Sequence, residues 1–336
     1  MEVYTIRDVA RRAGVAVSTV SRVLNGKKDV SEATRKRVLE VVEECGYVQN
    51  GNARFLKQDR SGFAAIIVRG RLSAFLSDVA ERMRLYAQEC GLKTITEYID
   101  EMDDEFDVMR QLHAQKRAGA FVFLGSRLDE RCEAVRALGA PCVFATVDAS
   151  ARDFGCASSV SIDDHAAAGA VISGLIQMGH TRIAIFGGNP EGDDPIARRH
   201  QGAVDALRAH GVALNAEDFC QVRFSLEDAY ASAKAYFAEH PDVTAAFAMS
   251  DTIAAGVIRA LHDLGKAVPG DVSVAGFDGT ALARYFIPSI ATVSQPAEDI
   301  AQVSVALLLE RMAGEDARHV TIAHTLVDGE SVSVRN

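Results

Sequence analysis

Residues 5–26 read TIRDVARRAGVAVSTVSRVLNG and decide the fold of the N-terminal region. Apolar side chains recur at helical spacing over residues 6–13, directly after Thr5, whose hydroxyl can cap a helix. Gly14 can take the positive φ at which helices commonly end, and residues 17–24 have the pattern of a second short helix. The segment therefore predicts two helices joined by a tight turn, which is a helix-turn-helix.

A third helix follows the pair and completes a small core. Ser31 is placed to cap this helix. The apolar residues expected to pack against the first two helices are Val38, Leu39, Val41 and Val42. Three short helices around one core predict an all-α head over residues 1–46, whose second helix would enter the major groove of DNA.

Charge is divided between this head and the rest of the chain. The first 60 residues hold 12 Lys and Arg against 8 Asp and Glu, whereas the remaining residues hold 24 against 38. The net charge of −10 therefore conceals a basic head on an acidic body, as expected of a polyanion-binding module fused to a larger domain. A basic face can also simply be solvated, so charge supports DNA binding without establishing it.

The same N-terminal segment closely resembles the opening of LacI-family repressors, including the AGV turn and the TVSRVLN helix. The resemblance implies a DNA-binding surface that includes Thr5, base contacts from Val17, Ser18 and Arg22, and phosphate contacts from Thr19, Ser21 and Asn25. Arg22 can donate two hydrogen bonds to a guanine, which is worth about 1–3 kcal/mol of discrimination. Hydroxyl and amide groups suit phosphate oxygens, which set register. A helical pair used for protein contacts is the alternative.

Residues 47–60, YVQNGNARFLKQDR, resemble the hinge of that family. The resemblance implies a segment that folds into a short helix in the minor groove when two arms of a dimer meet on DNA. Leu56 has the position of the leucine that wedges open a base step, and Asn50, Ala53 and Arg54 precede it. Unstacking bases costs roughly a few kcal/mol, but the kinked duplex permits more contacts. An ordinary linker is the alternative.

From Phe63 onward, short apolar strands alternate with amphipathic helices. The strands read FAAIIV, AFVFLG, PCVFAT, RIAIFGG, AAFAMS and DVSVAGF, and the helices include residues 77–90, 129–138, 165–178, 196–210, 226–239 and 252–264. Repeated βα units with apolar strands predict parallel sheets covered by helices on both faces. About eleven strands are too many for one ordinary open sheet. We therefore expect two α/β lobes, with ligands at the carboxyl ends of the strands.

The body resembles the effector domain of the same family, which is similar to periplasmic sugar-binding proteins. The resemblance is carried by SIDDHAAAG, GHTRIAIFGG, ARRHQGAVDAL, AMSDTIAAGVIRAL, VPGDVSVAGFDG and IPSIATVSQP. It implies an N-terminal all-α helix-turn-helix head followed by a two-lobed α/β effector domain of the periplasmic-binding-protein-like type I over residues 61–336. The chain would cross between the lobes near residues 161, 291 and 322. The first lobe would then hold residues 61–161 and 292–321, and the second residues 162–291 and 322–336.

The resemblance also places an effector site in the cleft between the lobes. Arg199 and Asp278 are implied to hydrogen-bond the effector, since a guanidinium and a carboxylate suit hydroxyl groups. Asp251 matches a family aspartate, although the asparagine that precedes it in the family is Ser250 here. The strand-end loops that line the pocket in relatives hold Phe75, Ser126 and Phe224. Either aromatic side chain could equally belong to the core.

Three arginines follow strands of the first lobe. Arg69 and Arg71 lie at the end of the first strand, and Arg127 follows another. Three guanidinium groups around one cleft suit a carboxylate or a phosphate. The effector is therefore expected to be a sugar or sugar derivative, and these arginines suggest an anionic one such as a uronic acid or a sugar phosphate. The alternative is that the arginines pair with nearby acids or face solvent.

Other functional classes have less support. The sequence has no G-x-S-x-G, P-loop, H-E-x-x-H or complete G-x-G-x-x-G, so we expect neither an enzyme nor a cofactor. The cysteines include no C-x-x-C pair, which predicts reduced thiols and no metal site; they are Cys45, Cys90, Cys132, Cys142, Cys156 and Cys220. No apolar run approaches about 18 residues, and the charged N-terminus lacks a signal stretch. This predicts a cytoplasmic protein and argues against an exported transport protein.

Together these features predict a transcriptional repressor that binds a near-palindromic operator as a homodimer, with a tetramer left open. A small molecule would control operator affinity by allostery, and the sequence leaves open whether a protein co-effector is used.

Overall fold

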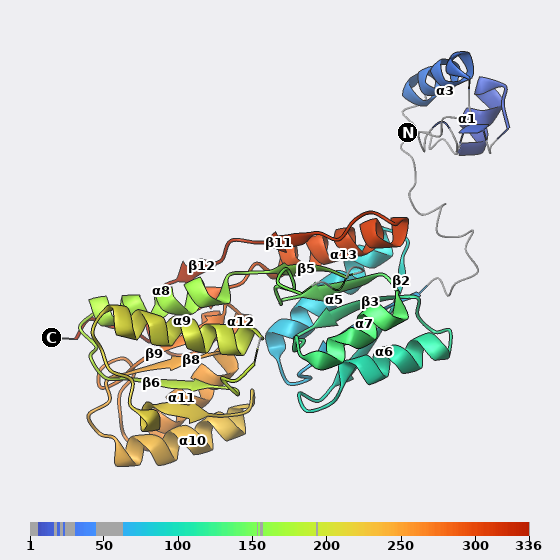
Figure 1. The fold of residues 1–336 in the computed structure, drawn as a ribbon. Coiled ribbons are helices and arrows are strands. Elements are labelled where there is room, and N and C mark those ends of the chain that lie inside the picture. The colour runs from blue at the N-terminus through green and yellow to red at the C-terminus, as the bar shows by residue number, and fades with distance from the viewer. Residues whose placement is uncertain are drawn as a thin grey trace. The chain divides into compact units, whose positions relative to one another are not determined.

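The computed structural model of the chain describes residues 6–16, 19–20, 23, 31–44, 63–152, 154, 157–192 and 194–335. The chain divides into two compact units, Met1–Gln58 and Asp59–Asn336. The division falls two residues before the boundary expected between hinge and body. Figure 1 shows the ribbon of both units. Each unit has its own core.

The first unit is helical. It contains α1 (Ile6–Ala13) and α3 (Glu32–Glu44), and residues 19, 20 and 23 are also helical. Gly14 has φ +65° after α1, and Ser31 Oγ accepts a hydrogen bond from Thr34 N at 3.3 Å, so the predicted stop and cap are both confirmed. The buried core comprises Val9, Ala10, Ala13, Val20, Val23 and Val38.

One residue predicted for this core lies outside it. Leu39 is 46% exposed, whereas its neighbour Val38 is fully buried. Successive residues of an α-helix point about 100° apart. With Val38 facing inward, Leu39 therefore faces solvent.

The first lobe of the second unit is built on a six-stranded parallel sheet with the order β11-β5-β4-β3-β1-β2. Its strands are β1 (Phe63–Arg69), β2 (Lys93–Ile99), β3 (Ala120–Leu124), β4 (Cys142–Ala145), β5 (Ala157–Ser161) and β11 (His319–Thr321). Helices α5 (Ala74–Glu89) and α13 (Ala297–Ala313) cover one face, and α6 (Glu105–Ala114) and α7 (Glu133–Leu138) cover the other, as Figure 1 shows.

The second lobe repeats this arrangement on a six-stranded sheet with the order β12-β10-β9-β8-β6-β7, in which β12 alone among the described strands is antiparallel. Its strands are β6 (Ile183–Gly187), β7 (Phe219–Gln221), β8 (Ala245–Ala248), β9 (Ser273–Asp278), β10 (Ala291–Ser294) and β12 (Thr325–Val327). Helices α8 (Asp164–Gln177) and α9 (Pro195–Ala209) pack on one face, and α10 (Leu226–Glu239) and α11 (Asp251–Asp263) on the other, with the short α12 (Ala281–Tyr285) at the edge.

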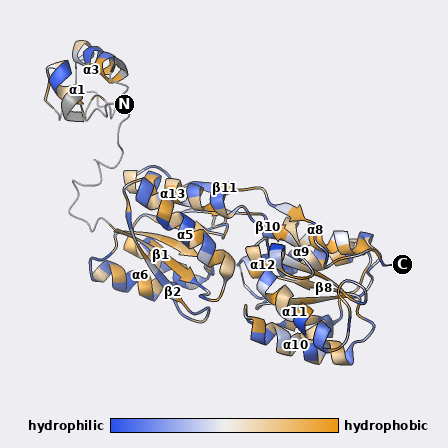
Figure 2. Cartoon of the chain, turned by 180° about the vertical axis from the view of Figure 1, so that it is seen from behind, coloured by the Kyte–Doolittle hydropathy of each residue, from blue (hydrophilic) through white to orange (hydrophobic). Residues whose placement is uncertain are grey.

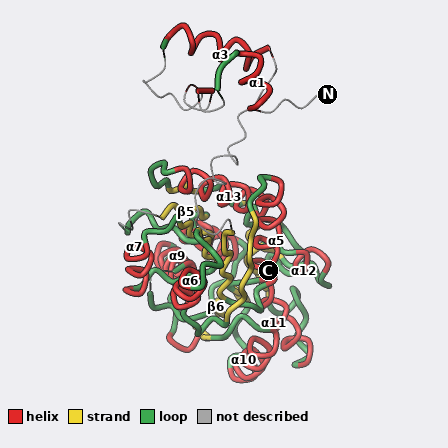
Figure 3. The backbone as a smooth tube through the Cα atoms, turned by 90° about the vertical axis from the view of Figure 1, so that its right-hand side faces the viewer, coloured by secondary structure: helices red, strands yellow, loops and turns green. Residues whose placement is uncertain are grey.

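The apolar strands explain these layers, because successive side chains of a strand point to opposite faces. In β1, Ile66 and Val68 pack under α5 and α13, whereas Ala65 and Ile67 pack against α6 and α7. Figure 2 shows hydrophobic residues concentrated on the strands and on the helix faces turned toward them. In Figure 3 helices surround the strands of the Asp59–Asn336 unit. The predicted fold class, a helix-turn-helix head with a two-lobed α/β body, is confirmed.

The chain passes between the lobes three times. The first crossing follows Ser161 at the end of β5, and the third lies between β11 and β12. The second comes after Ser294, three residues beyond the predicted position near residue 291, because β10 pairs with β9, with Ala291 opposite Ala275. The predicted first-lobe segment 292–321 therefore begins a few residues too early.

Two predicted helices also change their limits. Helix α5 begins at Ala74 rather than at residue 77, because Ser73 Oγ accepts a hydrogen bond from Leu76 N at 3.2 Å. The predicted helix 129–138 divides into a 3-10 turn (Glu130–Cys132) and α7.

Within the described ranges no helix is long and apolar enough to span a membrane. Among the described cysteines, Cys90, Cys132 and Cys220 are free thiols.

Candidate functional site

A cavity of about 440 Å³ lies between the two lobes. It is bordered by the carboxyl ends of strands from both sheets, including Arg69 of β1 and Asp278 of β9, which is where ligands bind in open α/β sheets. Its size is within the range of small-molecule sites. The predicted effector residues that line it are Arg69, Phe75, Ser126, Arg199, Phe224 and Asp278.

Arg199 organises the second-lobe wall. It is 6% exposed, donates from Nε to Asp164 Oδ1 at 2.8 Å and from Nη1 to the Met249 carbonyl at 2.8 Å. Its guanidinium also stacks on the Phe277 ring, 3.7 Å from the centroid, and lies 3.7 Å from Asp278 Oδ1. One side chain thus joins α8, β8 and β9 beneath the cavity.

Asp278 is held in an unusual backbone conformation. Its φ is +115°, a region that costs roughly 1–3 kcal/mol for a non-glycine residue and that is concentrated at functional sites. Gln295 secures it by donating from Nε2 to Asp278 Oδ1 at 2.8 Å and from its backbone N to Asp278 O at 3.1 Å. Thr146, with φ +70°, is a second strained residue on the cavity wall.

Burial sets the protonation behaviour of these acids. It raises the pKa of Asp278 and the pKa of Asp164, because both carboxyl groups are removed from water. Arg199 is the strongest influence that lowers the pKa of each. Arg199 therefore limits the increase without cancelling it, because burial remains the larger influence on the pKa of both carboxyl groups.

The first-lobe wall is built around Arg69, which is 8% exposed. Arg69 Nη2 donates to the carbonyl oxygen of Glu101, Nη1 donates to that of Gly125 at 3.4 Å, and Nε lies 3.5 Å from Glu105 Oε2. These contacts join the ends of β1, β2 and β3. Burial raises the pKa of Glu105, and Arg69 and the Arg127 backbone N–H act against that increase.

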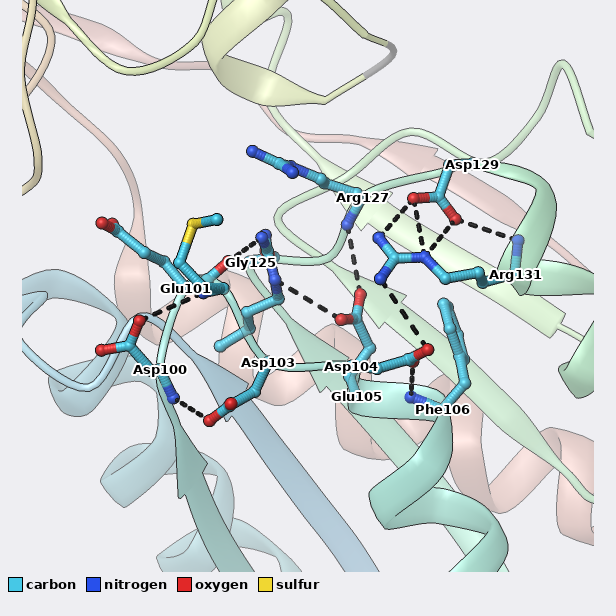
Figure 4. Close-up of polar contacts among 12 residues, drawn as sticks. Asp100, Glu101, Asp103, Asp104, Glu105, Phe106, Gly125, Arg127, Asp129 and Arg131 are labelled. Carbon is cyan, nitrogen blue, oxygen red and sulfur yellow. Dashed lines mark hydrogen bonds and ion pairs between the residues drawn. The ribbon is translucent and has the colours of Figure 1, made fainter.

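An acidic segment after β2 surrounds this wall, as Figure 4 shows. It contains Asp100, Glu101, Asp103, Asp104, Glu105 and Asp107. The Glu105 carboxylate accepts a hydrogen bond from the backbone N of Arg127 at 3.3 Å, while the Arg127 side chain reaches Asp194, with 3.5 Å between Nε and Oδ2. Arg131 pairs with Asp129 in the same network.

Within the described part of the chain, arginines and acids border the cavity in equal number. Among the described residues, the arginines that line it are Arg69, Arg127, Arg199 and Arg223, and the acids are Glu101, Asp194, Asp228 and Asp278. Each of the four arginines has a carboxylate within 4 Å. The predicted cluster of arginines therefore does not form a surplus of positive charge.

Comparison with known proteins identifies the family. Residues 5–50 match the family model of bacterial regulatory proteins, lacI family, and residues 172–332 match that of the periplasmic binding protein-like domain. The HTH-type transcriptional regulator MalR of Clostridium butyricum is 31% identical over 333 residues, which cover 97% of this chain and 98% of that protein. The chain belongs to the LacI family of transcriptional regulators.

Other members support the same assignment over the whole length. Catabolite control protein A of Priestia megaterium is 30% identical, with 96% of this chain and 97% of that protein covered. The solved complex of the transcriptional regulator CelR with cellobiose has a TM-score of 0.73 at 26% identity, covering 98% of this chain and 99% of that one. This LacI-family chain is accordingly a DNA-binding regulator and not an enzyme.

Two predicted effector residues of this LacI-family protein do not line the cavity. Arg71 is exposed and borders only a smaller neighbouring hollow. Asp251 is fully buried and accepts hydrogen bonds from Thr280 N at 2.7 Å and from Thr292 Oγ1 at 2.6 Å. Its carboxylate ties together the segments around β9, so its role here is structural.

The departure at Ser250 has a local explanation. Ser250 Oγ accepts a hydrogen bond from Ile253 N at 3.1 Å and so caps α11. A serine satisfies this capping role as well as the asparagine expected in the LacI family.

Several cavity residues were not predicted from the sequence. They include Glu101, Met102, Asp194, Arg223 and Asp228. Two signals were present: the acidic run directly after a strand, and the Asp194-Pro195 pair, which is typical of a helix start. Asp194 does cap α9, accepting from Ile196 N at 3.0 Å and Ala197 N at 2.9 Å.

The predicted DNA contacts of this LacI-family head can be placed in one case. Thr19 is helical and half-buried, and its backbone N donates to Ala16 O at 2.9 Å. The other predicted contacts lie outside the described residues; they are Thr5, Val17, Ser18, Ser21, Arg22, Asn25, Asn50, Ala53, Arg54 and Leu56.

Proposed function

We propose that this regulator is a cytoplasmic repressor that binds a near-palindromic operator as a homodimer, and that a small molecule in the interlobe cavity controls its affinity for DNA. The observation that carries the proposal is a cavity of about 440 Å³ bordered by both lobes, in a chain that also has a helix-turn-helix head. A two-fold dimer would bind two half-sites related by the same symmetry.

The cavity favours an uncharged effector with many hydroxyl groups over the anion suggested by the arginines alone. An anion would have to compete with carboxylates for each guanidinium, and those carboxylates would be left without partners. Hydroxyl groups can instead accept from the arginines and donate to the acids. Phe75 and Phe224 supply an apolar surface on which a sugar ring can pack. The CelR relative was solved with cellobiose, a ligand of this chemistry.

Control of DNA binding follows from a difference in affinity between two arrangements of the lobes. A ligand can shift the equilibrium only as far as its affinities for the two arrangements differ, typically by about 1–3 kcal/mol. Ligand contacts to both lobes, such as those available from Arg69 and Asp278, are made together only when the cleft is closed. Closure would then change the relation of the two hinge segments in a dimer.

Operator selection tests the proposal directly. The purified full-length protein is incubated with random double-stranded DNA at physiological salt, and bound sequences are amplified and read over several rounds. We expect enrichment of a near-palindromic site with a flexible pyrimidine–purine step at its centre. A metabolite screen then measures which compounds change binding to that site. The absence of any enriched sequence, with and without metabolites, would refute the proposal.

Substitution of the hinge leucine tests the implied mode of binding. Leu56→Ala is expected to weaken binding to the selected operator much more than binding to unrelated DNA, because only specific binding uses the kinked step. Fluorescence anisotropy on both duplexes measures the two affinities. Equal losses on the two duplexes would contradict the wedge.

The charge of the effector is tested with matched ligands. Neutral disaccharides, beginning with cellobiose, and their phosphorylated counterparts are titrated into the protein by calorimetry. We expect binding by a neutral member and weaker binding of its phosphate. A phosphate or uronic acid that binds more tightly than its neutral counterpart, with Arg69→Ala abolishing the preference, would restore the anionic assignment.

A further inference from the structure

Two loops from different lobes meet beside the cavity. Arg223, which follows β7 in the second lobe, extends to the loop after β2 in the first lobe. Its Nη2 lies 3.0 Å from both Oδ1 and Oδ2 of Asp100, and its Nε donates to Glu101 Oε1 at 2.5 Å. One guanidinium thus engages two carboxylates of the opposite lobe.

Both sides of this contact are held in place by their own lobes. The backbone N of Arg223 donates to Asp228 Oδ2 at 2.7 Å, which fixes the loop to the first turn of α10. On the other side, Asp100 N donates to Asp103 Oδ2 at 2.9 Å, and Met102 N donates to Asp100 Oδ1 at 3.2 Å. The ion pairs therefore join two ordered loops rather than two free side chains.

The contact also forms a boundary of the cavity. Glu101 and Arg223 line both the main cavity and a small hollow on its flank. A second contact between the lobes, Arg127 to Asp194, lines the main cavity as well. Parting the lobes must break both contacts, because each pair has one member on either side.

We propose that Arg223, Asp100 and Glu101 form a latch that favours the closed arrangement of the lobes and limits the cavity on this side. All three side chains belong to the protein, so the contacts of the latch do not involve the ligand. The latch therefore favours the closed arrangement whichever ligand is bound. This inference rests on the proposed function. It adds that Arg223, Asp100 and Glu101 set how much effector is needed to close the cleft. Arg223 is 53% exposed, so the latch acts in a well-screened environment and weakens as salt rises.

The arrangement of the lobes can be measured without effector or DNA. Spin labels are attached to one site on α6 and one on α10 of the full-length protein, through an introduced ketone-bearing amino acid that leaves the six native cysteines untouched. Pulsed electron–electron double resonance then gives the distribution of distances between the two spin labels, and so between the lobes. The variants are Arg223→Gln, which removes the charge, and Arg223→Lys, which keeps the charge but loses the two-carboxylate geometry.

Arg208→Gln is the matched control, because Arg208 pairs with Asp205 at the same 3.0 Å distance but within the second lobe. We expect Arg223→Gln to reduce the ratio of short to long distances by roughly two- to fivefold, and Arg223→Lys to reduce it less. Raising the salt concentration should move the unaltered protein in the same direction. The control should match the unaltered protein.

Identical distributions for the unaltered protein and Arg223→Gln would overturn the latch, as would an equal shift in Arg208→Gln. Operator selection measures DNA binding and does not depend on the distances between the lobes. A protein that selects no operator yet shows the Arg223 effect would refute the proposed function and leave the latch standing.

Discussion

Replacement of Arg199 by methionine tests how the second-lobe wall is held together. Arg199→Met preserves an unbranched apolar stem but removes the hydrogen bonds to Asp164 and to the Met249 carbonyl. The carboxyl groups of Asp164 and Asp278, which are 4% and 7% exposed, then lose their positive neighbour. Breaking a buried ion pair by removing one partner costs about 3–5 kcal/mol, since a buried charge is left uncompensated. We expect a loss of that size at pH 8.

The loss should depend on pH in a defined direction. Without Arg199, the pKa values of Asp164 and Asp278 rise further above those of the unfolded chain, since burial already raises both. An acid with a raised folded-state pKa contributes stability below its unfolded pKa, about 3.9, and loses that contribution as pH rises through the folded value. In the unaltered protein the pKa of Asp278 lies at about 8, so the Asp278 part of the difference appears as pH rises through that value. The difference between the variant and the unaltered protein should therefore be smallest at pH 5 and should increase through pH 8 to pH 9.

Urea unfolding followed by circular dichroism measures the effect, because the chain has no tryptophan. The transition of the Asp59–Asn336 unit is compared at pH 5, 6.5, 8 and 9. Arg208→Met serves as the control, since Arg208 has a 74% exposed side chain and its loss should change the free energy of unfolding by less than about 0.5 kcal/mol. A loss below about 1 kcal/mol at pH 8, or one that does not decrease at pH 5, would refute the reasoning.

Two further predictions concern the cavity and the packing of the second lobe. Asp278→Asn should abolish the effector response while leaving operator affinity unchanged, because the amide oxygen can still accept from Gln295 Nε2; a normal response to the effector found by the screen would exclude Asp278 from the site. Gly202→Ala should destabilise the protein by about 1–3 kcal/mol, because an added Cβ would lie 2.1 Å from the carbonyl oxygen of His165 on α8. Gly174→Ala on α8 itself meets no atom within 4 Å and should stabilise by up to about 1 kcal/mol; similar urea midpoints for the two variants would contradict this packing argument.

Local patterns predicted much of the site. Arg199 and Asp278 were predicted from motifs that resemble the LacI family, and both line the cavity. The sequence also points to Arg69 and Arg127 and leaves open whether they hold an anion or pair with nearby acids; the structure shows that both pair with acids. Their carboxylate partners are Glu105, 36 residues after Arg69, and Asp194, 67 residues after Arg127, and no local pattern connects such distant positions.

Asp251 illustrates the opposite error. Its place at the first residue of α11 resembles a ligand-binding position, but its carboxylate faces Gly276 and the hydroxyls of Thr280 and Thr292. Whether an aspartate at a strand–helix junction points into a cleft or under a neighbouring strand depends on side-chain packing. Periodicity and motif spacing carry no information about that packing.

The order of helices and strands, the two-lobed architecture and the division between a basic head and an acidic body followed from the amino-acid sequence, because hydrophobic periodicity and turn residues act over a few positions. The pairing of arginines with acids, the balance of charge around the cavity and the contact between Arg223 and Asp100 were decided only by the tertiary structure. Electrostatic interactions depend on distance and solvent exposure, which are settled when the parallel strands of both lobes bring distant residues to one cleft.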